Sequence, residues 1–355
     1  MRFTHETLPQ RVVFASGQAV ASVAEEIGRL GARRVMVIAA AAESSVADAV
    51  SADISVARRH DEVVMHVPAE VAHRAREAAV RARADAVLCV GGGSTTGLAK
   101  AVAMSGSPVA GLPIVAVPTT YAGSEATNVW GLTDGDLKTT GIDNLVLPRS
   151  IVYDASLTAS LPVEMSVASG LNAMAHCVDS MWGPRTDPVT QTLAIEGIGA
   201  LRRGLLAVQA DPAGISGREQ TMYGAYLAAV AFAAAGSGLH HKICHVLGGL
   251  FNLPHAPTHA IVLPHVLALN APGAPDAQQR MARAIDAPTA TEGLARLRAA
   301  LAAPSALKDI GMPEDGIAKA VDLVLSAAPA GNPTPVTERN VTALIRAAWE
   351  GSTAS

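Results

Sequence analysis

The side chains best suited to chemistry in this sequence are histidines, and most of the eleven lie in its second half: His176, His240, His241, His245, His255, His259 and His265. Asn172 and His176 are four residues apart, as are His241 and His245, so each pair would share one face of a helix. Imidazoles that converge in this way suit either a metal site or acid–base chemistry. A lone histidine is more often structural, and we expect that for His265.

A glycine-rich turn follows an apolar strand in the segment 86–100, which reads AVLCVGGGSTTGLAK. Glycines let the backbone approach a phosphate closely, and the start of a helix offers free N–H groups. The segment is neither a GxGxxG fingerprint nor a P-loop. A phosphate site and a simple strand-to-helix turn capped by Ser94 are therefore equally good interpretations of this turn alone.

A second hydroxyl-rich stretch, VPTTYAGSE at 117–125, also follows a predicted strand. Open α/β sheets bind ligands beyond the carboxyl ends of their strands. Two such loops after neighbouring strands favour a dinucleotide bound across both. The residues we expect to contact it are Gly92, Gly93, Ser94, Thr95, Thr119, Thr120, Ser124 and Lys138.

The first half of the chain alternates strands and helices in a way that would position these loops. We expect strands at 34–39, 61–66, 86–90 and 113–117, and helices at 43–52, at 69–83 after Pro68, and from the glycines through Lys100. This alternation is typical of parallel βαβ units covered on both faces.

After about Tyr153 the pattern becomes helical. Alanine- and leucine-rich stretches predict helices at 164–182, 189–207, 219–239, 277–285, 291–301 and 338–349. The expected fold is an α/β dinucleotide-binding domain, residues 1–154, followed by an α-helical catalytic domain, residues 155–355.

The composition excludes several classes of protein. The chain has 355 residues, a net charge of −4 and no basic run, which argues against a nucleic-acid or anionic-membrane partner. Its three scattered cysteines form neither a disulfide framework nor a CxxC metal motif, and the first ten residues do not resemble a secretory signal. We expect a cytoplasmic protein.

One uncharged stretch, 222–239, reaches the length of a membrane span. Its hydrophobicity comes mostly from alanine, and three glycines and a serine dilute it. We therefore expect a buried core helix that ends just before His240 and supports the histidines, and no membrane association.

These motifs together resemble the iron-containing (group III) alcohol dehydrogenase superfamily, which has a dehydroquinate synthase-like fold. The resemblance rests on GGGS…AK, PTT…GSE, GLNAMAH and HxxxH followed by LPH, and it covers residues 11–351. The stretches GGGSTTGLAKA, PTTYAGSEAT and GLHHKICHVLGGLFNLPHAPTH are similar to the maleylacetate reductase branch. The resemblance implies NADH or NADPH as hydride donor, a catalytic cleft between the two domains and a homodimer.

Two positions depart from the superfamily pattern. Its metal sites use one Asp and three His, and the matching residues here are Asn172, His176, His241 and His255. A neutral amide lacks the charge that helps to hold a divalent cation, so no metal is expected. Gly97 stands where many metal-dependent relatives carry Asp. The tip of the 34–39 strand, residues 39–42, offers no acid for a ribose hydroxyl, which leaves the choice of NADH or NADPH open.

The expected reaction is reduction of the carbon–carbon double bond of maleylacetate, a keto-diacid, to 3-oxoadipate. Such a site must bind two carboxylates, stabilise an enolate and supply a proton. We expect His241 and His245 to polarise the substrate and supply the proton, and Lys242 or a protonated histidine to bind carboxylates. The remaining catalytic candidates are His176 and His255, which would complete the anion pocket, and Asn172 and Tyr121 as hydrogen-bond donors.

Other interpretations of the sequence remain open. The first is a metal-dependent alcohol or polyol dehydrogenase in which Asn172 is a weak ligand, and chelation would abolish its activity. The others are a dehydroquinate-synthase-like lyase and a catalytically inactive nucleotide-binding sensor or scaffold. The histidine block argues against the lyase, and intact His241, Lys242 and His245 argue against the inactive protein.

Overall fold

The computed structural model describes residues 2–135 and 137–352, and it does not describe the side chains of Leu137 and Lys138. The described chain divides into two compact units, residues 8–161 and residues 2–7 with 162–352. The division falls after residue 161 rather than 154, and the N-terminal residues belong to the helical unit. There the Nδ1 atom of His5 lies 2.8 Å from Oδ2 of Asp187, a link that the sequence did not indicate.

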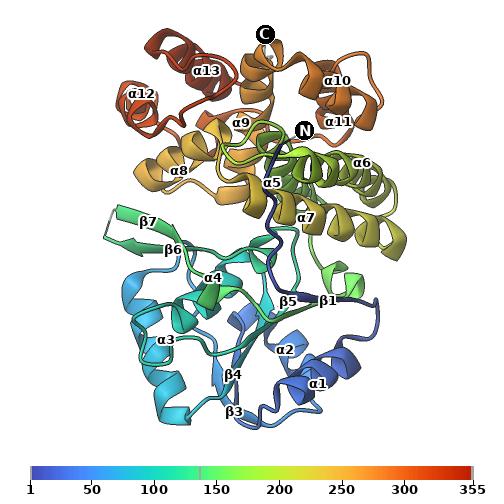
Figure 1. The fold of residues 1–355 in the computed structure, drawn as a ribbon, viewed down its shortest axis with the longest axis vertical. Coiled ribbons are helices and arrows are strands. Elements are labelled where there is room, and N and C mark those ends of the chain that lie inside the picture. The colour runs from blue at the N-terminus through green and yellow to red at the C-terminus, as the bar shows by residue number, and fades with distance from the viewer. Residues whose placement is uncertain (1, 136, 353–355) are drawn as a thin grey trace. The chain divides into compact units, whose positions relative to one another are not determined.

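A parallel sheet forms the centre of unit 8–161 (Figure 1). Its strands follow the order β1-β8-β5-β4-β2-β3, with bounds Arg11–Phe14 (β1), Ser150–Tyr153 (β8), Ile114–Pro118 (β5), Ala86–Gly91 (β4), Val35–Ile38 (β2) and Val56–His60 (β3). An antiparallel hairpin, β6 (Val129–Asp134) and β7 (Leu137–Ile142), adds a second small sheet.

Helices cover both faces of this sheet: α1 (Ala19–Leu30) and α2 (Ser44–Val50) on one, α3 (Ala69–Ala82) and α4 (Gly93–Ala103) on the other (Figure 1). Alternate residues of β2 show why. Val35 and Val37 pack with α1 and α2, whereas Met36 and Ile38 pack with α3 and α4. A strand buried on both faces needs apolar residues at every position, which explains its unbroken hydrophobic run.

The predicted strands at 34–39, 86–90 and 113–117 correspond to β2, β4 and β5. The strand predicted at 61–66 is wrong, because the strand of this region is β3 at Val56–His60. It pairs only with β2, so it is the edge of the sheet and tolerates charged Arg58 and Arg59 in its middle. Those charges hid it from a search for apolar runs.

The second unit is helical, as its alanine- and leucine-rich sequence predicted (Figure 1). Its helices are α5 (Val163–Ser180), α6 (Pro188–Ala210), α7 (Ile215–Ala235), α8 (Leu239–Phe251), α9 (His255–Asn270), α10 (Pro275–Ala284), α11 (Ala290–Ala300), α12 (Gly316–Ala327) and α13 (Glu338–Glu350). One apolar core joins α8, α9, α12 and α13, and includes Leu239, Ile243, Ile261, Val321 and Ile345.

The uncharged stretch 222–239 is not one continuous helix. Helix α7 ends at Ala235, residues 236–238 break the chain, and α8 starts at Leu239 in a direction 99° away. No single described helix is long and apolar enough to cross a membrane, although the bent pair of α7 and α8 passes that test by length and composition.

Helix α7 packs against α6 through glycines. A Cβ on Gly204 would lie 2.5 Å from the backbone nitrogen of Thr221, and one on Gly224 would lie 2.9 Å from that of Leu201. Such distances exclude any side chain, so the helices approach at these points because only hydrogen lies between them. This close packing accounts for the small residues of the stretch.

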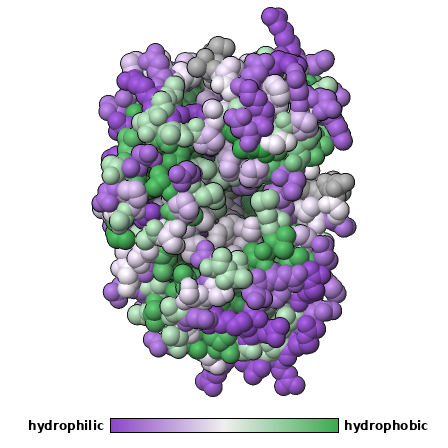
Figure 2. Space-filling model, turned by 180° about the vertical axis from the view of Figure 1, so that it is seen from behind, coloured by the Kyte–Doolittle hydropathy of each residue, from purple (hydrophilic) through white to green (hydrophobic). Residues whose placement is uncertain are grey.

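The surface drawn in Figure 2 is mixed in polarity, and the cysteines lie inside the protein. On the face drawn in Figure 2, hydrophilic residues cover much of the surface and hydrophobic ones are interspersed among them. Cys89, Cys177 and Cys244 are all buried free thiols, consistent with the expectation of no disulfide framework.

Candidate active site

At the start of helix α8, a buried carboxylate, that of Asp179, accepts hydrogen bonds from backbone N–H groups that have no partner within the helix. A Cβ on Gly238 would lie only 2.6 Å from Oδ1 of Asp179, so glycine is required for this approach. The Oδ2 atom of Asp179 accepts hydrogen bonds from the backbone N–H groups of Gly238 (3.1 Å) and His241 (3.3 Å). A carboxylate at a helix N-terminus is stabilised by these free N–H groups and by the helix dipole.

The same carboxylate orients the side chain of His241. Nδ1 of His241 lies 2.7 Å from Oδ2 of Asp179, and the two residues are 2% and 0% exposed. Burial raises the pKa of Asp179 to about 7, although backbone N–H donors oppose the shift. Burial and neighbouring imidazoles hold the pKa of His241 well below its usual value. With Nδ1 engaged, the buried Nε2 atom of His241 has no hydrogen-bond partner among the described residues.

His241 forms one wall of a small aromatic and polar pocket. Its ring stacks on that of His176, with centroids 4.9 Å apart and planes 17° apart. The ring of Phe232 contacts both, at 4.3 Å from His241 and 4.9 Å from His176. Asn172 lies one turn before His176 on α5, and its Oδ1 atom and Nδ1 of His176 are buried without a partner among the described residues. Oδ1 of Asn172, Nδ1 of His176 and Nε2 of His241 are thus three buried polar atoms without a partner among the described residues, which indicates a binding site for a polar ligand.

A second histidine pair adjoins this pocket. Nε2 of His240 lies 3.0 Å from Nδ1 of His259, and Sγ of Cys244 lies 3.6 Å from the same His240 nitrogen. Within the described residues this is the one group of three His, Cys, Asp or Glu ligands whose atoms all lie within 4.8 Å of one another. The two imidazoles form a direct hydrogen bond through one nitrogen each, so the geometry is that of a buried pair, while Nδ1 of His240 and Nε2 of His259 are buried without a partner among the described residues. Burial lowers the pKa of His240 to about 3.

The remaining predicted residues of the helical unit surround these groups. The ring of half-buried His245 lies 6.2 Å from that of His241, and the ring of exposed His255 lies 4.3 Å from that of His259. Lys242 follows His241 directly on α8, and because successive helical residues point about 100° apart, its side chain leaves on another face. His265, expected to be structural, is buried, and burial lowers its pKa to about 4.

Two residues of the site escaped the sequence analysis. Asp179 lies three residues after His176, so the pattern HCVD would have placed both on one face of α5. Phe232 lies near the end of α7, where nothing in an alanine-rich run marks it as a pocket wall. Spacing within one helix can reveal the first kind of residue, whereas the second needs the packing of two helices.

In the α/β unit the two predicted cofactor loops lie side by side. The N–H of Thr119 donates to the carbonyl of Gly91 at 3.2 Å. A Cβ on Gly92 would lie 3.1 Å from Cγ2 of Thr120, and Gly91 has a φ of +147°, which favours glycine. The glycines thus let the loop after β5 lie directly against the turn after β4.

The glycine turn keeps its helix N-terminus open. The N-cap of α4 is Gly92 and no side chain caps it, so the structure does not have the cap by Ser94 that one of the two interpretations of this turn included. Ser94 is instead the second residue of the helix, beside buried Thr95. Free N–H groups at an uncapped helix start are available to an anion such as a pyrophosphate.

A buried lysine ties the two loops together. Lys100 is 0% exposed, and its Nζ donates to the carbonyls of Ser124 (2.6 Å) and Val129 (2.7 Å) and to Oγ1 of Thr127 (3.1 Å). Burial lowers the pKa of Lys100 to about 7, against the opposing charge of Glu125. Helix α4 and the segment 124–129 are therefore held in one arrangement.

Three further predicted positions lie in this unit. Tyr121 is fully buried, with its hydroxyl 3.4 Å from Oγ1 of Thr158. A Cβ on Gly97 would lie 2.9 Å from Cγ2 of Val67, so the turn that carries Val67 takes the space of a side chain. Lys138 lies on β7, and its side chain is outside the described part of the chain.

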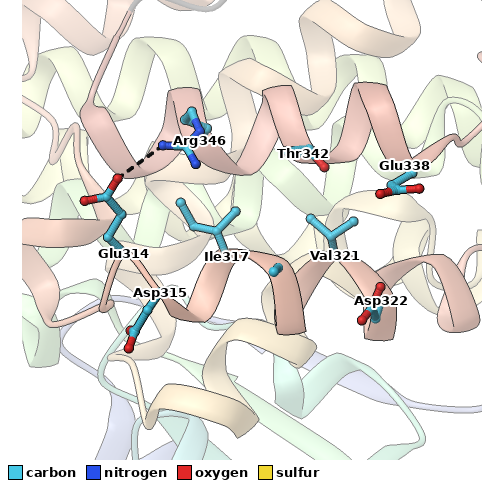
Figure 3. A pocket seen from close by; sticks show the side chains of 9 residues that line it. Glu314, Asp315, Ile317, Val321, Asp322, Glu338, Thr342 and Arg346 are labelled. Atoms are coloured by element: carbon cyan, nitrogen blue, oxygen red, sulfur yellow. Dashed lines mark hydrogen bonds and ion pairs between the residues drawn. The ribbon is translucent and has the colours of Figure 1, made fainter.

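The helical unit also has a surface groove of about 750 Å³ between α12 and α13 (Figure 3). Ile317 and Val321 point into it, and Glu314 pairs with Arg346 at 3.3 Å on its rim. No histidine lines it, and its acidic side chains do not suit a dicarboxylate substrate.

Comparison with known proteins decides the family. The sequence pattern of "Iron-containing alcohol dehydrogenase" matches residues 9–155, and that of "Fe-containing alcohol dehydrogenase family, C-terminal" matches residues 166–349. The chain belongs to the iron-containing alcohol dehydrogenase family. Membership confirms the predicted fold class, an α/β N-terminal unit followed by a helical one, and makes the protein an oxidoreductase.

Individual family members refine this assignment. A maleylacetate reductase of Sphingobium indicum is 43% identical over 353 residues, which is 99% of this chain and 98% of the relative. The crystal structure of an iron-containing alcohol dehydrogenase from Corynebacterium glutamicum has a TM-score of 0.95 at 58% identity and covers 98% of this chain and 97% of its own. That of a maleylacetate reductase from Agrobacterium tumefaciens has a TM-score of 0.92 at 39% identity, with 99% of each chain covered. The resemblance to the maleylacetate reductase branch is thus confirmed.

Proposed function

We propose that this protein reduces the carbon–carbon double bond of maleylacetate to 3-oxoadipate, with NADH or NADPH as hydride donor. The observation that carries the proposal is the similarity to proteins named maleylacetate reductase over 99% of the chain. The buried histidine pocket with its unpartnered polar atoms supports it, because a keto-diacid needs several hydrogen-bond donors at once.

The proposed chemistry is a conjugate reduction. A bound NADH or NADPH would supply a hydride to the alkene carbon β to the ketone, so that the π electrons move onto the ketone oxygen as an enolate. A proton then reaches the α-carbon, and NAD⁺ or NADP⁺ and 3-oxoadipate leave. The protein must therefore stabilise one developing negative charge and deliver one proton.

We assign these two tasks to His241, helped by His245. The Nδ1–H of His241 donates to Asp179, which leaves Nε2 as the atom that faces a ligand. Protonated at Nε2, His241 can donate a hydrogen bond to the enolate oxygen and then release the proton, while Asp179 stabilises the imidazolium. A dianionic substrate raises the pKa of nearby imidazoles, so substrate binding itself favours the protonated form.

In this proposal the two substrate carboxylates are bound by neutral hydrogen-bond donors as well as by charged ones. Burial lowers the pKa of His176 to about 4, so this imidazole is neutral near pH 7 before substrate binds. We propose that His176 and Asn172 donate to one carboxylate and that His255 donates to the other. Lys242, which lies on another face of α8, is not assigned a substrate contact. Tyr121, whose buried hydroxyl lies 3.4 Å from Oγ1 of Thr158, is not assigned a substrate contact. We also propose a homodimer in the cytoplasm, as the family resemblance of the sequence implies.

The donor set does not suit a divalent metal, and we propose a metal-independent reaction. Asn172 and three imidazoles bring no negative charge to the positions that match the superfamily's metal ligands. Rings of His176 and His241 that stack face to face, 17° from parallel, do not converge on a common point as tetrahedral ligands do. No step of the proposed reaction uses a metal.

The test is an assay of NADH and NADPH oxidation with maleylacetate, run with and without a strong chelator. We expect turnover that chelation leaves unchanged, and less than one equivalent of metal by elemental analysis. Loss of activity on chelation, restored by iron or zinc, would contradict metal independence. Turnover of simple alcohols without reduction of maleylacetate would instead favour an alcohol or polyol dehydrogenase.

A further inference from the structure

We propose that Glu43 makes the protein select NADH over NADPH. This inference rests on the proposed dinucleotide site and goes further, because it assigns the residue that reads the adenosine ribose. The sequence left the choice open, since residues 39–42 after β2 carry no acid. Glu43 is the next residue, and it ends the short 3₁₀ turn Ala41–Glu43 that follows the strand.

The side chain of Glu43 reaches back over the edge of the sheet. Its Oε1 atom accepts a hydrogen bond of 3.1 Å from Oγ1 of Thr119, the first residue after β5. In the sheet, β4 lies between β2 and β5, so a contact from the end of β2 to the end of β5 spans the end of β4. The carboxylate of Glu43 therefore lies beside the glycine turn and not out in solvent past α2.

This is the position of an acid that recognises a ribose in a doubly wound sheet. The pyrophosphate of a dinucleotide lies on the glycine-rich turn and the helix start, here Gly92 and α4. The adenosine ribose then lies toward the neighbouring strand, here β2, where a carboxylate accepts hydrogen bonds from its hydroxyls. Glu43 is half-buried and engages only a neutral hydroxyl in its described hydrogen bond, so it keeps acceptor capacity for a ribose.

The charges around the ends of β2 and β3 also favour NADH over NADPH. A 2′-phosphate would bring about two negative charges close to Glu43 and needs an arginine or lysine to receive it. Past the end of β3 the chain continues with Asp61 and Glu62, and the nearby Arg74 is already engaged by Glu62 at 2.6 Å and 2.9 Å. Arg59 is likewise engaged, at 2.6 Å from Asp48. Arg59 and Arg74 are therefore already engaged by acids, which makes them less available to a 2′-phosphate.

The experiment compares Glu43→Gln with the wild type. Glutamine keeps the size and the acceptor for Thr119, so the change removes charge and leaves the loop contact in place. We expect the ratio of dissociation constants, NADPH over NADH, to be roughly ten or more in the wild type and to fall by a factor of roughly ten in the variant, the scale of one unfavourable charge contact. Asp53→Asn, which removes an exposed acid after α2, is the matched control and should leave the ratio unchanged.

Binding is measured by quenching of protein or nicotinamide fluorescence without substrate, so the result does not depend on maleylacetate turnover. An unchanged ratio in Glu43→Gln, or a wild type that binds NADPH as tightly as NADH, would overturn the role of Glu43 while leaving the proposed reductase intact. If neither dinucleotide binds, both proposals fail. The same ratio in kcat/KM, measured with maleylacetate, should follow the binding ratio.

Discussion

At the scale of single residues, the clearest functional device is the pair of Asp179 and His241. The carboxylate accepts from two backbone N–H groups and from Nδ1 of His241, so it is held rigidly and holds the imidazole rigidly in turn. A buried carboxylate of this kind fixes the tautomer of its histidine partner and lowers the energy of the imidazolium form. The proton needed for the enolate would be held at Nε2 of a ring that cannot rotate.

This arrangement predicts how the two residues depend on each other. His241→Ala should lower kcat by a factor of roughly ten to a thousand, the scale of one preorganised donor or acid. Asp179→Asn keeps an acceptor but loses the charge, and should lower kcat by a factor of roughly ten or more with NADH binding unchanged. The double variant should be no slower than His241→Ala alone, because both changes remove the same function. Steady-state kinetics of the three variants checks this.

Two results would count against the dyad. Near wild-type turnover in His241→Ala would remove that histidine from the mechanism. Additive losses in the double variant would mean that Asp179 acts mainly by holding the start of α8. Asp276→Asn, at the start of α10, is a control for the loss of one acid, and melting temperatures separate misfolding from lost chemistry.

The sequence predicted individual residues best where two of them share one helix. Asn172 with His176, and His241 with His245, follow from four-residue spacing. Spacing could not show that His241 would meet Asp179, or that the ring of His240 would bond to His259, because these contacts join different helices. Nor could it show that burial leaves the imidazoles neutral, since exposure depends on the packing of several helices.

At the scale of elements, the glycine turn, α4 and the segment 124–129 act as one part. Lys100 is the link, with three acceptors for its three N–H groups. The sequence predicted both loops and the helix through Lys100, but an AK dipeptide near the end of an apolar helix gives no sign that its ammonium group is buried. The edge strand β3 and helices α8 and α9 were harder to predict, because charges, glycines and Pro264 interrupt their apolar patterns.

Removal of that link should weaken both stability and cofactor binding. Lys100→Met keeps the apolar stem but leaves two buried carbonyls and a hydroxyl without their donor, at a cost of about 2–4 kcal/mol in the free energy of unfolding. We also expect the dissociation constant of NADH to rise, since both loops contact the dinucleotide in our proposal. Urea unfolding and fluorescence titration measure the two effects.

A surface lysine provides the comparison. Lys308 lies with Nζ 5.6 Å from the centre of the Trp349 ring, and Lys308→Met should cost about 1 kcal/mol or less. Equal losses in the two variants would contradict the anchoring role of Lys100. A stability loss in Lys100→Met without weaker NADH binding would mean that the segment 124–129 is not part of the cofactor site.

At the scale of the whole molecule, buried histidines should govern the response to acid. Burial lowers the pKa of His176 and His265 to about 4 and that of His240 to about 3. At a pH between these values and the ordinary pKa of about 6.5, the histidines bind protons in the unfolded chain but not in the folded protein. Two buried carboxyls, Asp179 and Glu125, oppose this, because burial raises the pKa of both, that of Asp179 to about 7, and the folded protein then holds the extra protons.

The buried histidines outnumber these two carboxyls, so the free energy of unfolding should fall as the pH drops from about 6.5 toward 4. Each buried histidine contributes up to about 1.4 kcal/mol per pH unit in this window. Urea unfolding at pH 7, 6 and 5 measures the slope, and His265→Gln, outside the proposed catalytic machinery, should reduce it by close to one histidine's share. His73→Gln, exposed on α3, is the comparison variant for the loss of one histidine at the surface. The prediction is contradicted if the free energy of unfolding does not change with pH in the wild type, or changes equally in the wild type and His265→Gln. The folded protein would then take up protons on these imidazoles. The substrate pocket would in that case be cationic and not neutral.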